Sequence, residues 1–271
     1  MREERLTAWE GASAEALAAE WGAPAVQLFR RVGSTNDVAR RLAAAGAPAG
    51  TVVLAEEQLA GRGRVGRGWA SPPGLGLWLS IVVRPPEPAL AAAVPLLVGI
   101  ETARALDAFV GAGAVGLKWP NDVECAGRKL AGILCEAAWE GATSPSVVAG
   151  LGLNVLHSLD DFPPELRARA GSVRLAAAVP PRRREVAAAL VPSLLARLSR
   201  ELRLSPAELA ELESRDVLRG REVVVLEPAT GARLASGVAA GVAADGAFLL
   251  RGPSGVREVR SGTLRLAGLD E

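Results

Sequence analysis

The segment GRGRVGRGW, from Gly61 to Trp69, places three arginines and four glycines within nine residues. Glycine lets the backbone approach a ligand closely, and guanidinium groups bind carboxylate or phosphate oxygens through paired hydrogen bonds. The segment lacks the G-x-x-x-x-G-K-[ST] pattern of a P-loop, so side chains would supply most contacts to phosphate. Two interpretations follow: an arginine/glycine segment that binds nucleic acid, or a loop built around one small anionic substrate.

The two lysines of the chain, Lys118 and Lys129, lie in one short segment, KWPNDVECAGRK, and all the other basic residues are arginines. An ammonium group is a compact point charge and a guanidinium group is a planar fork, so a site that needs a focused charge does not accept arginine in place of lysine. The lysines are therefore candidates for chemistry on phosphate or carboxylate. Chance clustering on a solvated hairpin is the alternative.

Three further motifs carry polar groups at the ends of expected elements. KWPND, residues 118–122, suits the binding of ATP with Mg²⁺, although an ordinary turn with Asn-Asp at its corner has the same pattern. GSTN, residues 33–36, either caps a helix or directs hydroxyl, amide and backbone N–H groups at a polar ligand. GLGLNV, residues 150–155, has glycines at alternate strand positions, which leaves one strand face open to a ligand or another backbone.

The composition excludes several classes of protein. The chain has 271 residues, of which 49% are hydrophobic and 23% charged, enough for one large domain and a small one. A formal net charge of +1 gives no global attraction to nucleic acid or anionic lipid. The charged N-terminus is unlike a signal peptide and no apolar stretch is long enough to span a membrane, so we expect a cytoplasmic protein without a membrane partner. Two separated cysteines and one histidine, His157, predict neither a disulfide framework nor a structural metal site.

The hydrophobic pattern predicts the elements that position these motifs. The arginine/glycine segment is expected as a loop between two strands, and KWPND as a turn that leads into a hairpin with Ala-Gly at its tip. Strands are expected over residues 51–58, 75–83 and 146–155, the strand and hairpin over 113–141, and helices from GSTN to Gly46, over 89–109 with a boundary at Pro95, and around 182–200 and 206–218.

The pattern changes abruptly from Gly220 to short β segments separated by glycine turns. The expected segments are REVVVLE, GVAAGVAA, GAFLLR and TLRLAG. This break predicts a catalytic domain over residues 1–218 and a small all-β domain over residues 219–271.

Taken together and in this order, GSTN, Q-x-x-GRGRVGRGW, KWPND, KLAGIL-x-E and GLGLNV resemble the motif series of biotin protein ligases, the biotin-[acetyl-CoA-carboxylase] ligases. Each motif alone is modest, but five in this order are specific. The resemblance is strong over residues 30–156 and weak over the β-rich tail. It implies an α/β catalytic domain with a mixed sheet and flanking helices, followed by a small all-β, SH3-like domain.

The resemblance also implies the reaction and the residues that perform it. Biotin and MgATP would give biotinyl-5′-AMP and pyrophosphate, and the biotin would then pass to a lysine of a biotin carboxyl carrier domain. Mg²⁺ would arrive with ATP rather than at a metal site of the protein. The implied biotin-binding residues are Ser34, Thr35, Asn36, Gln58, Arg62, Gly63, Arg64 and Lys129; the nucleotide-binding residues are Arg62, Trp69, Lys118, Asn121 and Asn154; the catalytic residues are Lys129, Arg64, Lys118 and Asp122.

The residues themselves are compatible with this chemistry. Joining a carboxylate to an α-phosphate requires cations that screen the repulsion between two anions and align the reacting atoms. Transfer then requires a neutral amine from the acceptor lysine, whose ordinary pKa is about 10.4, and we expect Asp122 to assist its deprotonation. The loop from Gly61 to Trp69 is expected to be mobile without substrates and ordered around biotinyl-5′-AMP.

Other outcomes stay open. Many relatives carry an N-terminal DNA-binding helix-turn-helix, but only about thirty residues precede GSTN here, so we expect a monofunctional ligase without a DNA partner. A homodimer through an exposed sheet edge is an expectation from the family. The alternative enzyme is a lipoate or octanoate ligase or transferase of the same fold. The alternative of another class is a nucleic-acid-binding module, which the near-zero net charge and the absence of tyrosine disfavour.

Overall fold

A mixed eight-stranded sheet forms the centre of the computed structural model, which describes residues 3–138 and 146–268. The strand order is β1-β4-β5-β6-β10-β9-β8-β7; β4 and β5 pair in parallel and the other neighbours pair antiparallel. The strands are β1 (Glu4–Arg5), β4 (Val26–Val32), β5 (Val52–Gln58), β6 (Gly76–Val83), β7 (Val115–Lys118), β8 (Asp122–Cys125), β9 (Arg128–Ala138) and β10 (Ser146–Asn154). The predicted α/β class with a mixed sheet is therefore confirmed.

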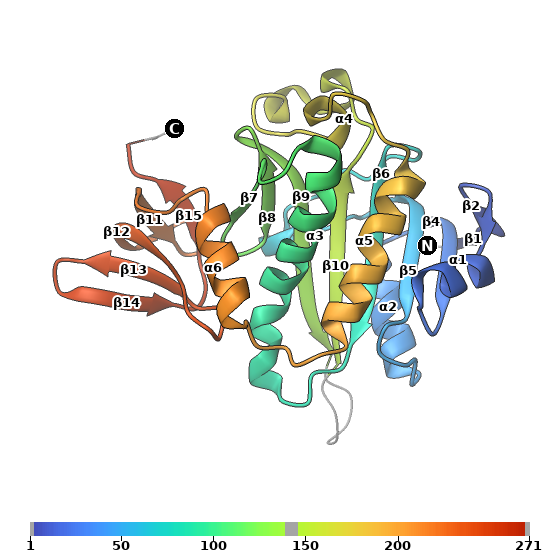
Figure 1. The fold of residues 1–271 in the computed structure, drawn as a ribbon, viewed down its shortest axis with the longest axis horizontal. Helices are drawn as coiled ribbons and strands as arrows, with labels where there is room; N and C mark the ends of the chain where they lie inside the picture. Colours follow the sequence, from blue (N-terminus) through green and yellow to red (C-terminus); the bar gives the residue numbers. More distant parts are fainter. Residues whose placement is uncertain (1–2, 139–145, 269–271) are drawn as a thin grey trace.

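Helices cover both faces of this sheet. α3 (Val94–Val110) and α5 (Arg183–Leu198) pack together across one face, in front of β9, β10 and β6 in Figure 1, and α1 (Ala14–Trp21) packs beside α5. α2 (Thr35–Ala44) packs on β5, β6 and β10 and contributes to a separate apolar cluster. All eight residues of β6 are buried, as expected for a strand covered on both faces.

Local sequence explains the elements that lead to the predicted motifs. Ala126 and Gly127 both have positive φ, 49° and 74°, the conformation of a type I′ turn, and they join β8 to β9 at the predicted hairpin tip. Pro95 lies in the first turn of α3, where a proline needs no N–H partner, so the predicted boundary is confirmed. Residues 139–141 of the predicted hairpin segment lie outside the described residues, as do residues 1–2 and 269–271 at the ends of the predicted domains.

The C-terminal segment forms a second, antiparallel sheet with strand order β14-β13-β12-β11-β15. Its strands are β11 (Glu222–Leu226), β12 (Arg233–Val242), β13 (Phe248–Gly252), β14 (Gly255–Val259) and β15 (Thr263–Leu266). Four of them were expected; β14 was missed because it is an edge strand with four exposed residues and no apolar alternation.

The second sheet lies beside α6 (Pro206–Arg215), at the opposite end of the molecule from the N-terminal elements (Figure 1). Two hydrogen bonds tie this region to the strand that carries Lys118: the Trp119 indole donates to the Gly246 carbonyl at 3.0 Å, and the Val217 amide donates to the Leu117 carbonyl at 3.1 Å. The division of the chain at residue 218 stays a prediction.

The remaining short elements are β2 (Ala8–Trp9), β3 (Ala12–Ser13) and α4 (Val173–Ala176). The sequence predicted none of them, nor β1, β4 and α1. The two-residue strands are too short to show a periodicity, but β4, VQLFRRV, has seven residues and was simply missed. Among the helices of residues 3–138 and 146–268, none is long and apolar enough to cross a membrane.

Candidate functional site

One cavity of about 1020 Å³ lies where the five sequence motifs meet. Its wall includes the first turn of α2, the end of β5, the loop after it, the β7–β8 turn, β9, β10 and residues of the C-terminal sheet. Every predicted site residue lines this cavity: Ser34, Thr35, Asn36, Gln58, Arg62, Gly63, Arg64, Trp69, Lys118, Asn121, Asp122, Lys129 and Asn154.

The GSTN motif does more than cap α2. Ser34 occupies the N-cap position, but its side chain makes no capping hydrogen bond, so the hydroxyl is not used for the helix. The backbone N–H of Thr35 donates to Gln58 Oε1 at 2.8 Å, and the Thr35 hydroxyl lies 3.0 Å from the same oxygen. Gln58 Nε2 donates to Ser71 Oγ at 2.8 Å, which fixes the orientation of the Gln58 amide.

Asn36 is the centre of a buried polar network. Its Nδ2 donates to Glu136 Oε2 at 2.7 Å and to the Leu134 carbonyl at 3.2 Å, and its Oδ1 accepts from Ser80 Oγ at 2.6 Å. Both amide hydrogens are therefore used inside the protein. Ser80 and Glu136 were not among the predicted residues; Glu136 is the glutamate of KLAGIL-x-E, whereas Ser80 has no signal within an apolar strand.

Arg62 is held by acidic side chains on neighbouring elements. Its two terminal nitrogens each donate to one oxygen of Asp37 at 2.8 Å, and Nη2 lies 3.4 Å from Glu136 Oε2. This paired geometry is the strong form of an arginine–carboxylate interaction. The hydrogen bond from Arg62 holds the pKa of Asp37 below its usual value, and the hydrogen bond to Asp37 raises the pKa of Arg62. The predicted loop arginine is thus anchored to α2.

Arg64 connects the same loop to the C-terminal sheet. Its Nη2 donates to the Gly262 carbonyl at 3.2 Å, and burial lowers the pKa of its guanidinium. Val65, one residue further, has a φ of 59° and is 45% exposed. The loop is therefore attached through the side chains of Arg62 and Arg64, and the Gly63 and Trp69 amides close it on itself by donating to the Arg67 and Gly61 carbonyls, while Val65 at its tip is exposed.

The two lysines lie on the β7–β9 side of the cavity, each opposite a carboxylate. Lys129 Nζ donates to Asp122 Oδ1 at 2.6 Å, and Lys118 Nζ lies 3.8 Å from Glu124 Oε1. Burial raises the pKa of Glu124, with the nearby Asp122 charge acting in the same direction. The segment that the sequence singled out for its lysines is therefore a cluster of alternating charges on one hairpin.

The ring of Trp69 lies on a glycine surface of the sheet. A Cβ on Gly152 would lie 2.4 Å from Trp69 Nε1, and one on Gly132 would lie 3.1 Å from the ring. These two glycines pair directly across β9 and β10. The Lys129 ammonium lies 5.3 Å from the ring centroid, within the range of a cation–π contact. The alternate glycines of GLGLNV thus accommodate side chains: Trp69 at Gly152, and Asn36 at Gly150.

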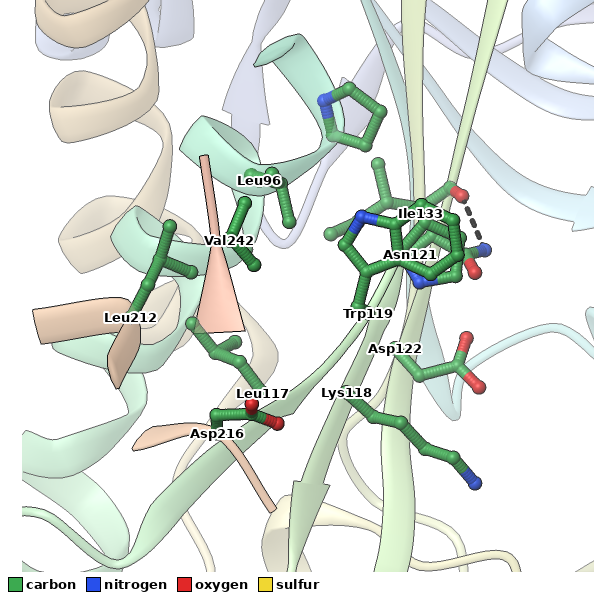
Figure 2. A pocket seen from close by; sticks show the side chains of 13 residues that line it. Leu96, Leu117, Lys118, Trp119, Asn121, Asp122, Ile133, Leu212, Asp216 and Val242 are labelled. Carbon is green, nitrogen blue, oxygen red and sulfur yellow. Dashed lines mark hydrogen bonds between the residues drawn. The ribbon is translucent and has the colours of Figure 1, made fainter. Parts of the chain in front are cut away.

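Asn121 and Asn154 fasten the backbone around the cavity. Asn121 Nδ2 donates to the Ile133 carbonyl at 2.8 Å, and Asn154 Nδ2 donates to the Gly171 carbonyl at 3.0 Å. Figure 2 shows Asn121 turned toward Ile133 at the back of the KWPND turn.

The KWPND turn separates two environments. The side chains of Lys118 and Asp122 extend away from Leu96, Leu212 and Val242, which border a small apolar cavity of about 20 Å³ behind the turn (Figure 2). Lys118 and Asp122 line both cavities, so the turn forms the wall between the large cavity and the apolar core.

His157 is a cavity residue that the sequence assigned no role. It is 2% exposed, stacks on Phe162 with ring centroids 4.9 Å apart, and its Nδ1 has no hydrogen-bond partner among the described residues. Burial lowers the pKa of this imidazole to about 4, so the ring is neutral at pH 7. Its position two residues after the end of GLGLNV was the available signal.

Charge is concentrated at this cavity although the chain is nearly neutral. Eight cationic side chains line it against three carboxylates, and five of the cations, Arg64, Arg67, Arg169, Arg221 and Arg265, have no ion-pair partner among the described residues. The cations are Arg62, Arg64, Arg67, Lys118, Lys129, Arg169, Arg221 and Arg265, and the carboxylates are Asp122, Glu124 and Asp161. Such a wall favours anionic ligands.

The described residues contain no cluster of three His, Cys, Asp or Glu side chains that could hold a metal ion. Cys125 and Cys135 are free thiols, and burial raises the pKa of Cys135 to about 12.

Comparison with known proteins identifies the family. The model of the biotin/lipoate A/B protein ligase family matches residues 28–154. The biotin–[acetyl-CoA-carboxylase] ligase of Paracoccus denitrificans is 34% identical over 243 residues, a match that covers 84% of this chain and 95% of that protein. The chain belongs to the biotin protein ligase family. The Mycobacterium tuberculosis enzyme of the same name is 35% identical over 208 residues, which cover 75% of each chain.

The ligase fold is also shared with solved structures. A biotin protein ligase from Aquifex aeolicus in complex with biotin and ATP matches with a TM-score of 0.73 and 26% identity, covering 89% of this chain and 99% of that chain.

The bifunctional ligase/repressor BirA of Bacillus spizizenii is 41% identical over 143 residues, 50% of this chain and 42% of that protein. This chain therefore spans less than half the length of that ligase relative.

Proposed function

We propose that the protein is an ATP-dependent biotin protein ligase. It activates biotin to biotinyl-5′-AMP and transfers the biotinyl group to a lysine of a biotin carboxyl carrier domain. The observation that carries this proposal is the convergence of the GSTN hydroxyls, the arginine/glycine loop and both lysines of the chain on one cavity. A neutral polar end for the biotin ring and a cationic end for its carboxylate and the nucleotide are thereby combined in one site.

The biotin ring binds at the α2 end of the cavity. Ser34, Thr35 and Gln58 offer hydroxyl and amide groups to its ureido ring, and Asn36 holds these elements in place. Arg62 and Gly63 cover the ring with their backbone. The Arg62 side chain is not available for this contact, because its guanidinium is bound to Asp37. A buried polar set of this kind binds well only a ligand that satisfies its hydrogen bonds.

Adenylation takes place at the cationic end. A carboxylate oxygen of biotin attacks the α-phosphorus of MgATP, and the bond from that phosphorus to the bridging oxygen breaks as pyrophosphate leaves with the electron pair. Lys129, Arg64 and Lys118 neutralise the charges that these reactants bring together, and most of the rate enhancement comes from alignment and electrostatics. Mg²⁺ enters with ATP as part of the substrate.

The nucleotide lies along the β9–β10 side. Trp69 provides a ring for stacking on adenine, since base–aromatic stacking contributes about 1–3 kcal/mol. Asn121 and Asn154 shape this side, because their amide nitrogens are bound to backbone carbonyls and fix the turn and the strand end.

Transfer requires a neutral acceptor amine. The Nζ of the acceptor lysine attacks the acyl carbon, the bond from that carbon to the phosphate oxygen breaks, and AMP leaves. The acceptor ammonium loses one proton before the attack and a second one after it, so that the amide keeps a single N–H, and Asp122 assists as a proton acceptor because its carboxylate lies at the cavity beside Lys129. Asp122→Asn, supplied with preformed biotinyl-5′-AMP, is expected to slow transfer and change its pH profile; unchanged transfer rates across pH would exclude this role.

One experiment tests the function as a whole. The protein is incubated with ATP and either labelled biotin with a biotin carboxyl carrier domain or labelled lipoate with a lipoate-accepting carrier domain, and covalent label on the carrier is measured. Label from biotin alone supports the proposal, label from lipoate supports the alternative ligase, and no label from either would refute both. Omission of ATP is the control that separates ligation from simple binding.

The proposal includes where the protein acts and with what. We place it in the cytoplasm, with the carrier domain as its protein substrate and no DNA partner. A homodimer through a sheet edge is the proposed assembly, and light scattering of the purified protein would measure it; a monomer at all concentrations would refute the assembly without affecting the ligase function.

A further inference from the structure

A chain of hydrogen bonds connects Glu136, outside the cavity, to Thr35 on its wall. Glu136 Oε2 and the Leu134 carbonyl are both acceptors, so they orient Asn36 with Nδ2 toward β9 and Oδ1 toward β6. Gly150 makes room for this amide, because a Cβ there would lie 2.1 Å from Asn36 Oδ1. The orientation of the Asn36 amide is therefore set from behind the cavity wall.

The next link is Ser80, which is 0% exposed. Its Oγ lies 2.6 Å from Asn36 Oδ1 and 2.8 Å from Thr35 Oγ1. A hydroxyl has one proton and an amide oxygen only accepts, so Ser80 donates to Asn36. Its proton is then not available to Thr35.

Thr35 completes the chain at the cavity. Its hydroxyl lies 3.0 Å from Gln58 Oε1, another oxygen that only accepts, so the Thr35 proton is used within the protein, on Gln58 or on Ser80. Because Ser80 gives its proton to Asn36, the lone pairs of the Thr35 oxygen stay free to accept a hydrogen bond from the cavity. A ligand group at this position must therefore bring its own N–H or O–H.

We infer that Glu136 is a positioning residue that sets the hydrogen-bond polarity of this wall, with Ser80 as the link through which a turned Asn36 amide would reach Thr35, and that it so selects a ligand with a buried N–H donor. Neither residue lines the cavity, and both act through Asn36 and Thr35. The inference rests on the proposed function, in which the donor is a ureido N–H of biotin. If Asn36 were turned over, Nδ2 would donate to Ser80, Ser80 would donate to Thr35, and the ligand N–H would lose part of its acceptor.

The test compares biotin with two isosteres in which one or the other ureido N–H is replaced by a ring oxygen. Adenylation is followed by pyrophosphate release. The wild-type protein is expected to discriminate against at least one isostere by about 10- to 100-fold in kcat/KM, the effect of one unmet buried hydrogen bond. No pyrophosphate release with biotin itself would refute the proposed function rather than this inference.

The variant Glu136→Gln provides a donor and allows the Asn36 amide to turn. We expect its KM for biotin to rise, with kcat nearly unchanged. The ratio of kcat/KM for biotin to kcat/KM for the isostere is expected to fall to less than a third of the wild-type ratio, a loss of about 0.7 kcal/mol or more of discrimination. The double variant Glu136→Gln/Ser80→Ala is expected to regain discrimination, because no Ser80 proton remains to occupy Thr35. Glu57→Gln, which removes a carboxylate from an ion pair with Arg31, is the matched control.

Two outcomes would overturn the inference: wild-type discrimination in Glu136→Gln, or a double variant no better than the single one. Should Glu136→Gln not fold, Ser80→Ala and Thr35→Val replace it. Ser80→Ala is expected to keep the discrimination and Thr35→Val to lose it, and the reverse pattern would refute the proposed polarity.

Discussion

Lys129 and Asp122 form an ion pair across the β8–β9 hairpin, with Nζ 2.6 Å from Oδ1, and the same ammonium lies 5.3 Å from the centre of the Trp69 ring. The lysine thus lies between a carboxylate and an aromatic ring at the cavity wall. A compact ammonium directs a point charge at this position, whereas the planar guanidinium of arginine spreads its charge and hydrogen-bonds in a fixed fork.

Replacement of Lys129 by arginine is therefore expected to impair adenylation although the charge is kept. We expect biotin-dependent pyrophosphate release to fall by about 10²-fold, the usual effect of removing one aligned electrostatic contact. Arg257→Lys, on the exposed strand β14, is the control and should have no effect. Near-normal adenylation by Lys129→Arg would show that the shape of this cation is unimportant.

Substitution of Gly152 by alanine tests the surface on which Trp69 rests. The new Cβ would lie 2.4 Å from Trp69 Nε1, so the ring must move away from the sheet. If the ring stacks on adenine, the KM for ATP is expected to rise about tenfold, and stability to fall by about 1–3 kcal/mol from overpacking.

Gly252→Ala provides the comparison, because a Cβ there meets no atom within 4 Å. Urea unfolding and ATP-dependent pyrophosphate release of both variants give the two readouts. An unchanged KM for ATP in Gly152→Ala, with stability reduced, would assign Trp69 a structural role only.

The central elements could be predicted because their patterns are strong. Strand β6 is a nearly continuous apolar run and β5 begins with four apolar residues, and the Ala126-Gly127 turn has the positive φ angles that a tight hairpin needs. The two-residue strands β1, β2 and β3 are too short to show such periodicity, and β1 is in addition defined by pairing with the distant strand β4. Local pattern thus determined what could be foreseen of the fold.

The site residues divide in the same way. Residues within motifs could be proposed from the sequence, and all of them line one cavity. Their partners could not: Asp37 binds Arg62 across 25 positions of the chain, and Ser80 binds Asn36 across 44. Such contacts depend on which strands become neighbours, so a serine inside the apolar run of β6 has no local signal.

His157 predicts a pH dependence of stability. Burial lowers its pKa to about 4 in the folded protein, from about 6.5 in the unfolded chain. The unfolded state therefore binds more protons between these values, and the free energy of unfolding falls as pH decreases from about 6.5 to 4.

The variant His157→Phe keeps an aromatic ring against Phe162 and removes the titrating group. Urea midpoints measured at pH 7.5 and 5.0 should differ less for this variant than for the wild-type protein. Equal pH dependence of the two proteins would show that His157 does not contribute.

Trypsin cleavage after Arg67 tests the behaviour of the arginine/glycine loop. Arg62 and Arg64 are attached to Asp37 and Gly262, but Val65 is 45% exposed and Arg67 has no ion-pair partner among the described residues. Because substrates bind only the closed form of the loop, they should reduce the population of the open form by a factor of about 1 + [L]/Kd, where [L] is the free substrate concentration. At a tenfold excess over Kd this factor is roughly eleven. We therefore expect biotin with MgATP to slow cleavage after Arg67 by about that factor. Cleavage after Arg203, in the exposed connection before α6, should be unchanged, and equal cleavage after Arg67 with and without substrates would refute loop closure.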